Sequence, residues 1–189
     1  MKKAYEEFIQ KMLWRTEHEL TNITPIVFDQ HSHQSLMTKK ALEIIDTPLI
    51  LWSEQDTPLT GEIPWDKLSK VITTGYANLI RFHHEAQVHP EHVHLMLDKK
   101  PINILGVPLL RTIQWSGRPH LASTSFYNGL ASTWGPEPMF IEHIMYGSVT
   151  EGPYDKYRLH IYAPRGTLVR SLHLDGRRLG AETYDPSVS

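Results

Sequence analysis

The sequence predicts an α+β fold in a single domain of residues 1–189, with a helical N-terminal part over residues 1–47 and a strand-rich core over residues 48–189. In the first half, apolar residues recur at helical spacing. From about residue 92 onward, short apolar segments typical of a mainly antiparallel sheet replace them. No internal repeat, low-complexity tract or linker divides the chain, so we expect one domain.

Three helices are expected in the first half. The opening helix is indicated by apolar residues at i, i+3, i+4, i+7 and i+8: Tyr5, Phe8, Ile9, Met12 and Leu13. A shorter helix is expected around Met37–Ile45, and Asp46-Thr47-Pro48 ends it because proline disfavours helical geometry at the preceding residue. The clearest helix follows Pro64 and has one apolar stripe: Leu68, Val71, Ile72, Tyr76, Leu79 and Ile80. Gly75 lies within this pattern as a point of close packing.

The strands are expected mostly later in the chain. Leu49–Trp52 is an early, short and buried strand. The remaining sheet elements are predicted at His92–Leu97, Leu109–Trp115, Leu121–Ser125, Tyr157–Ala163 and Leu168–Leu174. Two short helices are expected between them, near Asn128–Thr133 and Pro138–Tyr146.

Composition narrows the classes of function. The formal net charge is only −2, so no global charge draws the chain to nucleic acid or to an anionic membrane. The absence of cysteine excludes disulfides, thiolate metal sites and a cysteine nucleophile. No segment approaches the roughly 18 apolar residues of a membrane span, and the N-terminus lacks the apolar run of a signal peptide. We therefore expect a cytoplasmic protein, with delivery into a host or target cell left open.

The most informative stretch is Gly117–Trp134. A short apolar approach, Leu121-Ala122, leads into Ser123-Thr124-Ser125 and then into a stretch of helical character. Small hydroxyl side chains at a strand end can bond to a ligand while the backbone stays close to a planar ring. The same residue types also commonly end a strand and cap the next helix. The residues alone leave both interpretations open.

Ser123-Thr124-Ser125, followed by the aromatic pair Phe126-Tyr127 and a short helix, resembles the Ser-Thr-Ser motif of arginine-type ADP-ribosyltransferases. With Thr133-Trp134 shortly after it, the segment is most similar to phage-borne members of that family, which modify host proteins. The stretch from Tyr157 to Thr167, with its Pro-Arg-Gly-Thr turn, resembles a later core strand of the family.

The resemblance implies an ADP-ribosyltransferase-like fold with NAD as substrate. It implies a nicotinamide pocket lined by Ser123, Thr124, Ser125 and Phe126, with Ser123 also among the catalytic residues, and transfer of ADP-ribose to a protein or nucleic-acid acceptor. Such enzymes break the nicotinamide–ribose bond through an oxocarbenium-like centre, which a carboxylate stabilises. The family uses an Arg on an early strand and a Glu on a late strand for this purpose.

For the arginine, the resemblance implies Arg111, at the end of the apolar segment Pro108-Leu-Leu-Arg111. The planar guanidinium would hold phosphate or ribose oxygens of NAD. Two other segments stay open for the first strand. Leu49–Trp52 is followed by Ser53 where the arginine belongs, and the segment around His94 carries histidine, as in the His-type branch of the fold.

For the glutamate, the outcome depends on how the Pro-Arg-Gly-Thr strand is matched. If it is the last strand, the Glu-x-Glu positions fall on Arg158 and His160, which are not carboxylates. If it is the preceding strand, Glu182 is the candidate catalytic residue. Glu151, in the loop before the strand, is a third candidate. An alternative function is therefore a catalytically inactive member of the fold that acts by binding protein.

Histidine and glutamate residues also cluster in the middle of the chain: His83, His84, Glu85, His89, Glu91, His92 and His94. Imidazole and carboxylate groups are common ligands of zinc and similar metals. Their spacing does not give the HExxH arrangement that places two imidazoles on one helix face. We expect no metal site, and a His-liganded metal-dependent hydrolase is the remaining alternative function.

Overall fold

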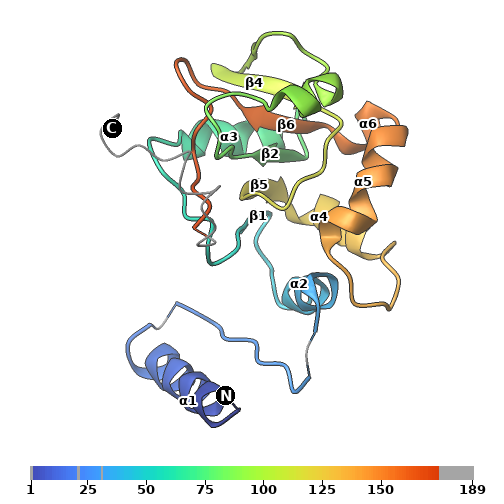
Figure 1. Cartoon of the computed structure of the whole chain (residues 1–189). Helices are drawn as coiled ribbons and strands as arrows, with labels where there is room; N and C mark the ends of the chain where they lie inside the picture. Colours follow the sequence, from blue (N-terminus) through green and yellow to red (C-terminus); the bar gives the residue numbers. More distant parts are fainter. Residues whose placement is uncertain (1, 21, 31, 175–189) are drawn as a thin grey trace. The chain divides into compact units, whose positions relative to one another are not determined.

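The computed structural model describes residues 2–20, 22–30 and 32–174 (Figure 1). The chain divides into two compact units, Met1–Ser32 and His33–Ser189. The first contains helix α1 (Lys2–His18), where the sequence predicts the opening helix. Helix α2 (Gln34–Leu42) belongs to the second unit, so the first unit ends well before residue 47. Within the described residues, no helix has the length and apolar character needed to cross a bilayer.

The second unit is built on one six-stranded sheet in the order β1-β5-β2-β6-β4-β3. Its strands are β1 (Leu49–Trp52), β2 (Leu79–Arg81), β3 (Ile102–Ile104), β4 (Val107–Thr112), β5 (His120–Ser123) and β6 (Leu159–Tyr162). Only β2 and β6 pair in parallel, and the other neighbours are antiparallel. The predicted α+β class with a mainly antiparallel sheet is confirmed.

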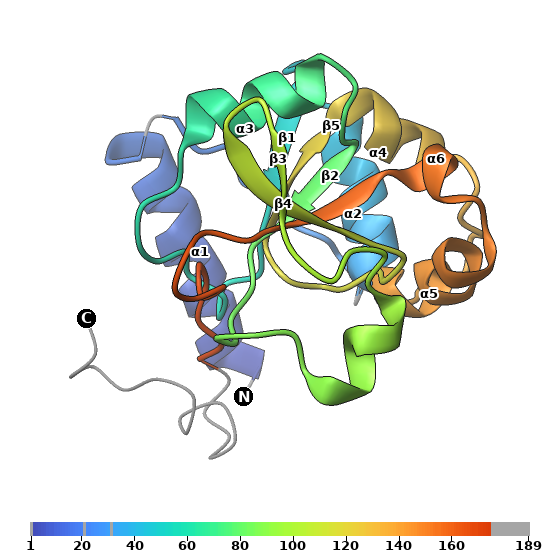
Figure 2. The same cartoon turned by 90° about the horizontal axis from the view of Figure 1, so that it is seen from above.

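Helices cover the sheet through two apolar clusters. Helix α3 (Trp65–Thr73) packs Leu68, Val71 and Ile72 against side chains of β2, β4 and β5. The opposite cluster joins α4 (Thr124–Ala131) and α5 (Ile141–Glu151) to Leu79, Ala122 and Leu159. Helices α4, α5 and α6 (Tyr154–Tyr157) lie together at one end of the sheet, apart from α3 (Figure 2). Alternate residues of β2 therefore serve opposite cores, as the period of a strand requires.

The predicted helix after Pro64 is too long. Helix α3 ends at Thr73, and Gly75 follows with a φ of +79°, a left-handed conformation that glycine adopts without steric cost. The guanidinium of Arg158 donates to the Gly75 carbonyl, which fixes this turn. Leu79 and Ile80 consequently belong to strand β2, although their spacing continues the helical stripe.

Two predicted strands are wrong. The segment His92–Leu97 falls largely in a 3₁₀ helix, η1 (Pro90–Leu95), because Pro90 presets helical φ at its start and the His89 side chain accepts from the Glu91 N–H. The segment Leu168–Leu174 makes only isolated bridges, His83 with Val169 and Leu59 with Ser171. This segment lies along loops and does not add a strand to the edge of the sheet.

Candidate functional site

Arg81 ends strand β2 in the middle of the sheet, between β5 and β6. Its side chain is only 2% exposed. Nη2 donates to Oε1 of Gln114 at 3.1 Å, whereas Nε and Nη1 are buried without a hydrogen-bond partner. Removing a guanidinium from water costs several kcal/mol unless an acceptor replaces the water. Arg81 is therefore a buried cation with unused donors.

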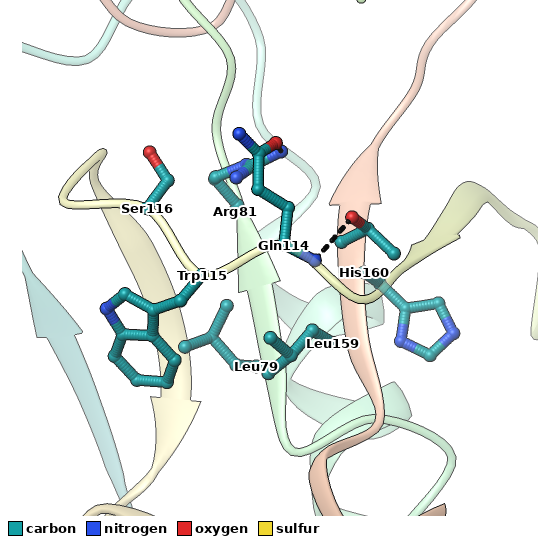
Figure 3. Close-up of a pocket in the computed structure, with 8 residues that line it drawn as sticks. Leu79, Arg81, Gln114, Trp115, Ser116, Leu159 and His160 are labelled. Atoms are coloured by element: carbon teal, nitrogen blue, oxygen red, sulfur yellow. Dashed lines mark hydrogen bonds between the residues drawn. The ribbon is translucent and has the colours of Figure 1, made fainter. Parts of the chain in front are cut away.

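These donors border a narrow recess beside β2 and β6, which is too small to admit a water molecule. Its walls come from Leu79, Arg81, Thr112, Gln114, Trp115, Ser116, Leu159 and His160. In Figure 3 the Gln114 side chain lies against Arg81, and the Trp115 ring lies beside Leu79. The His160 ring turns away from Arg81. The backbone N–H of Gln114 donates to the Thr112 hydroxyl at 3.0 Å, which fixes the start of the loop carrying Gln114.

A second arginine, Arg118, follows in the same loop and is 13% exposed in its side chain. Its Nη1 contacts both ring nitrogens of His83, and its Nη2 lies 3.3 Å from Oε1 of Glu85. Burial, and secondarily the charge of Arg118, lower the pKa of Arg81 to about 9. Burial also lowers the pKa of Arg118. Both groups are still cations at neutral pH, and among the described residues only Arg118 of the two forms an ion pair, with Glu85.

His83 and Glu85 complete the surroundings of Arg118. Burial lowers the pKa of His83 to about 4, so the ring is neutral and accepts from the guanidinium. Glu85 is ionised, because its hydrogen bond to His83 and the charge of Arg118 hold its pKa well below the ordinary value. His83 Nε2 lies 3.1 Å from Glu85 Oε2. The Glu85 carboxylate thus interacts with both His83 and Arg118.

The recess adjoins a wider hollow of about 310 Å³, since Ser116 lines both. This volume lies in the range of roughly 300–1,000 Å³ typical of small-molecule sites. The hollow is lined by Gln34, Glu54, Thr57, His84, Ser116, Gly117, Arg118, Phe140, Glu142 and His173. It offers cationic, carboxylate and aromatic groups within one cavity, which is the mixture that a charged, ring-containing ligand requires.

Arg111, the arginine implied by the resemblance, lies elsewhere in the sheet. It is on β4, and both β2 and β6 separate β4 from the Ser123 strand β5. Asp98 binds it with Oδ1 at 2.7 Å from Nη2 and Oδ2 at 3.0 Å from Nε, and also accepts its backbone N–H. The Arg111 guanidinium lies over the Tyr154 ring, 5.8 Å from its centroid. The structure therefore places Arg111 in a local ion pair and not beside Ser123.

The hydroxyls of the Ser-Thr-Ser motif hold the corner between β5 and α4. Ser123 caps α4 by accepting from the Phe126 N–H, and its Oγ lies 2.8 Å from that of Ser125. Thr124 is buried and donates to the carbonyl of Thr47 at 2.6 Å. Ser125 and Phe126 line a separate hollow of about 480 Å³ among α4, α5 and α6. The motif thus begins a helix, and part of it faces a cavity other than that of Arg118.

The candidate carboxylates of the sequence analysis do not meet in the site as described. Glu182 lies outside the described residues. Glu151 is exposed at the end of α5. At the Glu-x-Glu positions, Arg158 donates to carbonyls of Gly75 and Asp155, while the buried His160 contacts the Tyr154 hydroxyl at 3.1 Å. Strand β6 thus presents no carboxylate at these positions.

The histidine cluster is divided by the fold. His83 and His84 lie near Arg118, whereas His89, His92 and His94 lie on or next to η1. Among residues 2–20, 22–30 and 32–174, no group of three or more His, Asp or Glu side chains is arranged to hold a metal ion.

Sequence reasoning missed Arg81, Arg118, Glu54 and Glu142. In the segment Leu79-Ile80-Arg81, as in the segment that ends at Arg111, apolar residues lead directly to an arginine. Recognising Gly75 as a helix end would have exposed it as a strand. Comparison of the chain with protein-family models, with curated proteins and with solved structures finds no match in any of the three.

Proposed function

We propose that this chain is an ADP-ribosyltransferase-like domain that binds NAD and transfers ADP-ribose to a macromolecular acceptor, with Arg81 in the role first considered for Arg111. The observation that supports this most is the position of Arg81. It ends the strand that pairs directly with β5, and β5 leads into Ser123-Thr124-Ser125. An arginine on an early strand beside the Ser-Thr-Ser strand is the order that the resemblance requires.

The chemistry of the site suits a dinucleotide. A pyrophosphate carries negative charge and several acceptor oxygens, and Arg81 has unused donors at Nε and Nη1. Arg118 adds a second positive charge at the edge of the adjoining hollow. The hollow would receive the nicotinamide end of NAD, with Phe140 as an aromatic wall. To reach these donors the anion would have to widen the recess, which is too small for a water molecule in the ligand-free chain. The bound anion would then relieve the desolvation of Arg81.

The test is NAD binding by the full chain, measured by calorimetry for wild type and for a matched pair of variants. Arg81→Met should weaken binding by about 100-fold, the loss expected when one partner of a buried charge contact is removed. Arg111→Met should leave the Kd within about threefold, because Asp98 already uses that guanidinium. Labelled NAD incubated with host-cell extract then tests for transfer to a protein or nucleic acid.

Absence of NAD binding by the wild type would refute the proposal. Equal Kd values for wild type and Arg81→Met, with weak binding by Arg111→Met, would return the role to Arg111.

A second candidate function is a catalytically inactive domain of the same fold that acts by binding another protein. The observation in its favour lies at the start of strand β6. Arg158, which precedes the strand, and His160, within it, stand at the Glu-x-Glu positions and are held by internal hydrogen bonds. This function predicts NAD binding without release of nicotinamide, together with a protein that co-purifies stoichiometrically. Nicotinamide release by the wild type would exclude it.

A further inference from the structure

Cleavage of the nicotinamide–ribose bond needs a carboxylate, and strand β6 has none at the positions where the resemblance places one. The Arg158 side chain binds the carbonyls of Gly75 and Asp155, and His160 is only 1% exposed. If the chain is catalytic, its carboxylates therefore come from other elements that reach the arginine site.

Three glutamates lie in this region and differ in their interactions. Glu85 and Glu142 act on the charges of both arginines, and Glu54 lines the hollow together with Arg118. Glu85 is bound to His83 and to Arg118, so its charge is already neutralised. Glu142, in the first turn of α5, accepts the backbone N–H of Gly117 at 3.3 Å. Its charge acts on both Arg81 and Arg118, and its side chain lines the hollow. Glu142 thus lies at the boundary between the cations and the cavity.

Glu54 lines the same hollow from the segment after β1. Gln34 donates to its Oε1 at 2.6 Å, and Oε1 of Gln34 accepts the Ile141 N–H at 2.8 Å. Gln34 therefore links Glu54 to the residue next to Glu142. Burial, followed by the negative charge of Asp56, raises the pKa of Glu54, so this carboxylate is a stronger base than an exposed glutamate.

We propose that Glu142 and Glu54 are the two carboxylates that cleave NAD in this site, with water as the simplest acceptor. This inference rests on the proposed function. It places the carboxylates at the start of α5 and after β1, rather than on β6 or at Glu182. The geometric basis is the hollow of about 310 Å³, which both carboxylates line together with the guanidinium of Arg118 and the ring of Phe140.

In the reaction, the bond between ribose C1′ and the nicotinamide nitrogen breaks, and its electron pair leaves with nicotinamide, which becomes neutral. Glu142, as carboxylate, stabilises the positive charge that develops at C1′. The water oxygen forms the new bond to C1′ while Glu54 accepts its proton. That proton is then released to solvent, so the products are nicotinamide and ADP-ribose.

Release of nicotinamide from NAD by the full chain tests this assignment. Glu142→Gln should lower kcat by about 100-fold or more while NAD still binds, because a group that stabilises the transition state contributes this much. Glu54→Gln should lower kcat by about 100-fold and move the acid limb of the pH–rate profile. Glu62→Gln, exposed and outside the lining of the hollow, is the matched control and should match the wild type.

The outcomes separate the two proposals. Loss of activity in Glu182→Gln with full activity in Glu142→Gln would overturn the assignment and leave the proposed function standing. NAD binding by the wild type without nicotinamide release would also overturn it. Failure of the wild type to bind NAD would overturn both. Glu142→Asp, which keeps the charge, should recover part of the activity lost in Glu142→Gln, and a variant that has merely unfolded would not bind NAD.

Discussion

Two arginines in one sheet, Arg81 on β2 and Arg111 on β4, stand in opposite electrostatic situations. Arg81 is buried and leaves two donor nitrogens without partners. The Arg111 side chain is 41% exposed and is bound through both nitrogens of its fork by Asp98. A paired, half-exposed arginine contributes to the local structure. A buried and unpaired one lowers stability. Under the proposed function, this is the cost of a site for an anion.

The largest expected effect is a loss of stability at low pH, because a buried histidine lies in the neighbourhood of each of the two arginines. Burial lowers the pKa of His83, near Arg118, and of His160, near Arg111, to about 4. The unfolded chain, with histidine pKa values near 6.5, takes up protons between about pH 6.5 and 4 that the folded chain refuses. The free energy of unfolding should thus have its full value above about pH 6.5. As the pH drops from there toward 4, it should fall by roughly 1.4 kcal/mol per pH unit for each such histidine.

Urea unfolding across this pH range measures the slope. His83→Gln and His160→Gln should each reduce it by roughly one proton's contribution, whereas exposed His94→Gln should not. A reduced slope in only one variant would show that the two regions are not equivalent in burial.

The second effect concerns Arg81 itself. Arg81→Met replaces a buried, unpaired cation by an apolar side chain, so the free energy of unfolding without ligand should rise by about 1–4 kcal/mol. Arg111→Met should instead lower it, because Asp98 loses its partner. Denaturation without and with NAD measures both, and NAD should stabilise only the chain that retains Arg81. A loss of stability in Arg81→Met would mean that Gln114 and the nearby glutamates already compensate the charge.

The comparison also shows what local sequence can reveal. Leu49–Trp52 was predicted with its correct bounds, since a short apolar run before a turn has few other structures available. The helix after Ser123 was placed too late, although Ser123 itself is a common capping residue. Gly75 was interpreted as a packing point in a helix, which concealed strand β2 and Arg81.

The candidate site could not be predicted from local sequence patterns, because it depends on contacts between residues that are distant in the sequence. Arg111 and Asp98 are bound across thirteen positions of sequence, and their pairing follows from how η1 and β4 pack. Arg118 meets His83 only because β2 pairs with β5, and both residues lie just beyond the last paired residues, Arg81 and His120. Whether a charge is paired is a property of tertiary structure, so the similar patterns before Arg81 and Arg111 do not reveal which arginine forms an ion pair.

The third effect concerns Arg111, which of the two compared arginines is the one in an ion pair. Asp98 accepts the backbone N–H and the guanidinium of Arg111, and its side chain is 8% exposed. Asp98→Asn removes the charge and one acceptor oxygen, so we expect a loss of about 1–2 kcal/mol, reduced by the exposure of Arg111. The Kd for NAD should stay unchanged. Thermal unfolding with NAD titration measures both, and weaker NAD binding would implicate this region in the site.

The smallest effect concerns Ser123. This residue ends strand β5, which pairs with the Arg81 strand β2, and it caps helix α4. Its side chain accepts the Phe126 N–H, so Ser123→Ala should lower the free energy of unfolding by about 1 kcal/mol, the usual contribution of a helix cap. Ser148→Ala, inside α5 and exposed, should instead raise it by about 0.5 kcal/mol through helix propensity. Opposite signs in urea unfolding would confirm the capping role. If Ser123→Ala kept full stability but bound NAD more weakly, the hydroxyl would contact the ligand, as the resemblance implies, and the site would extend from Arg81 along β5 to this corner.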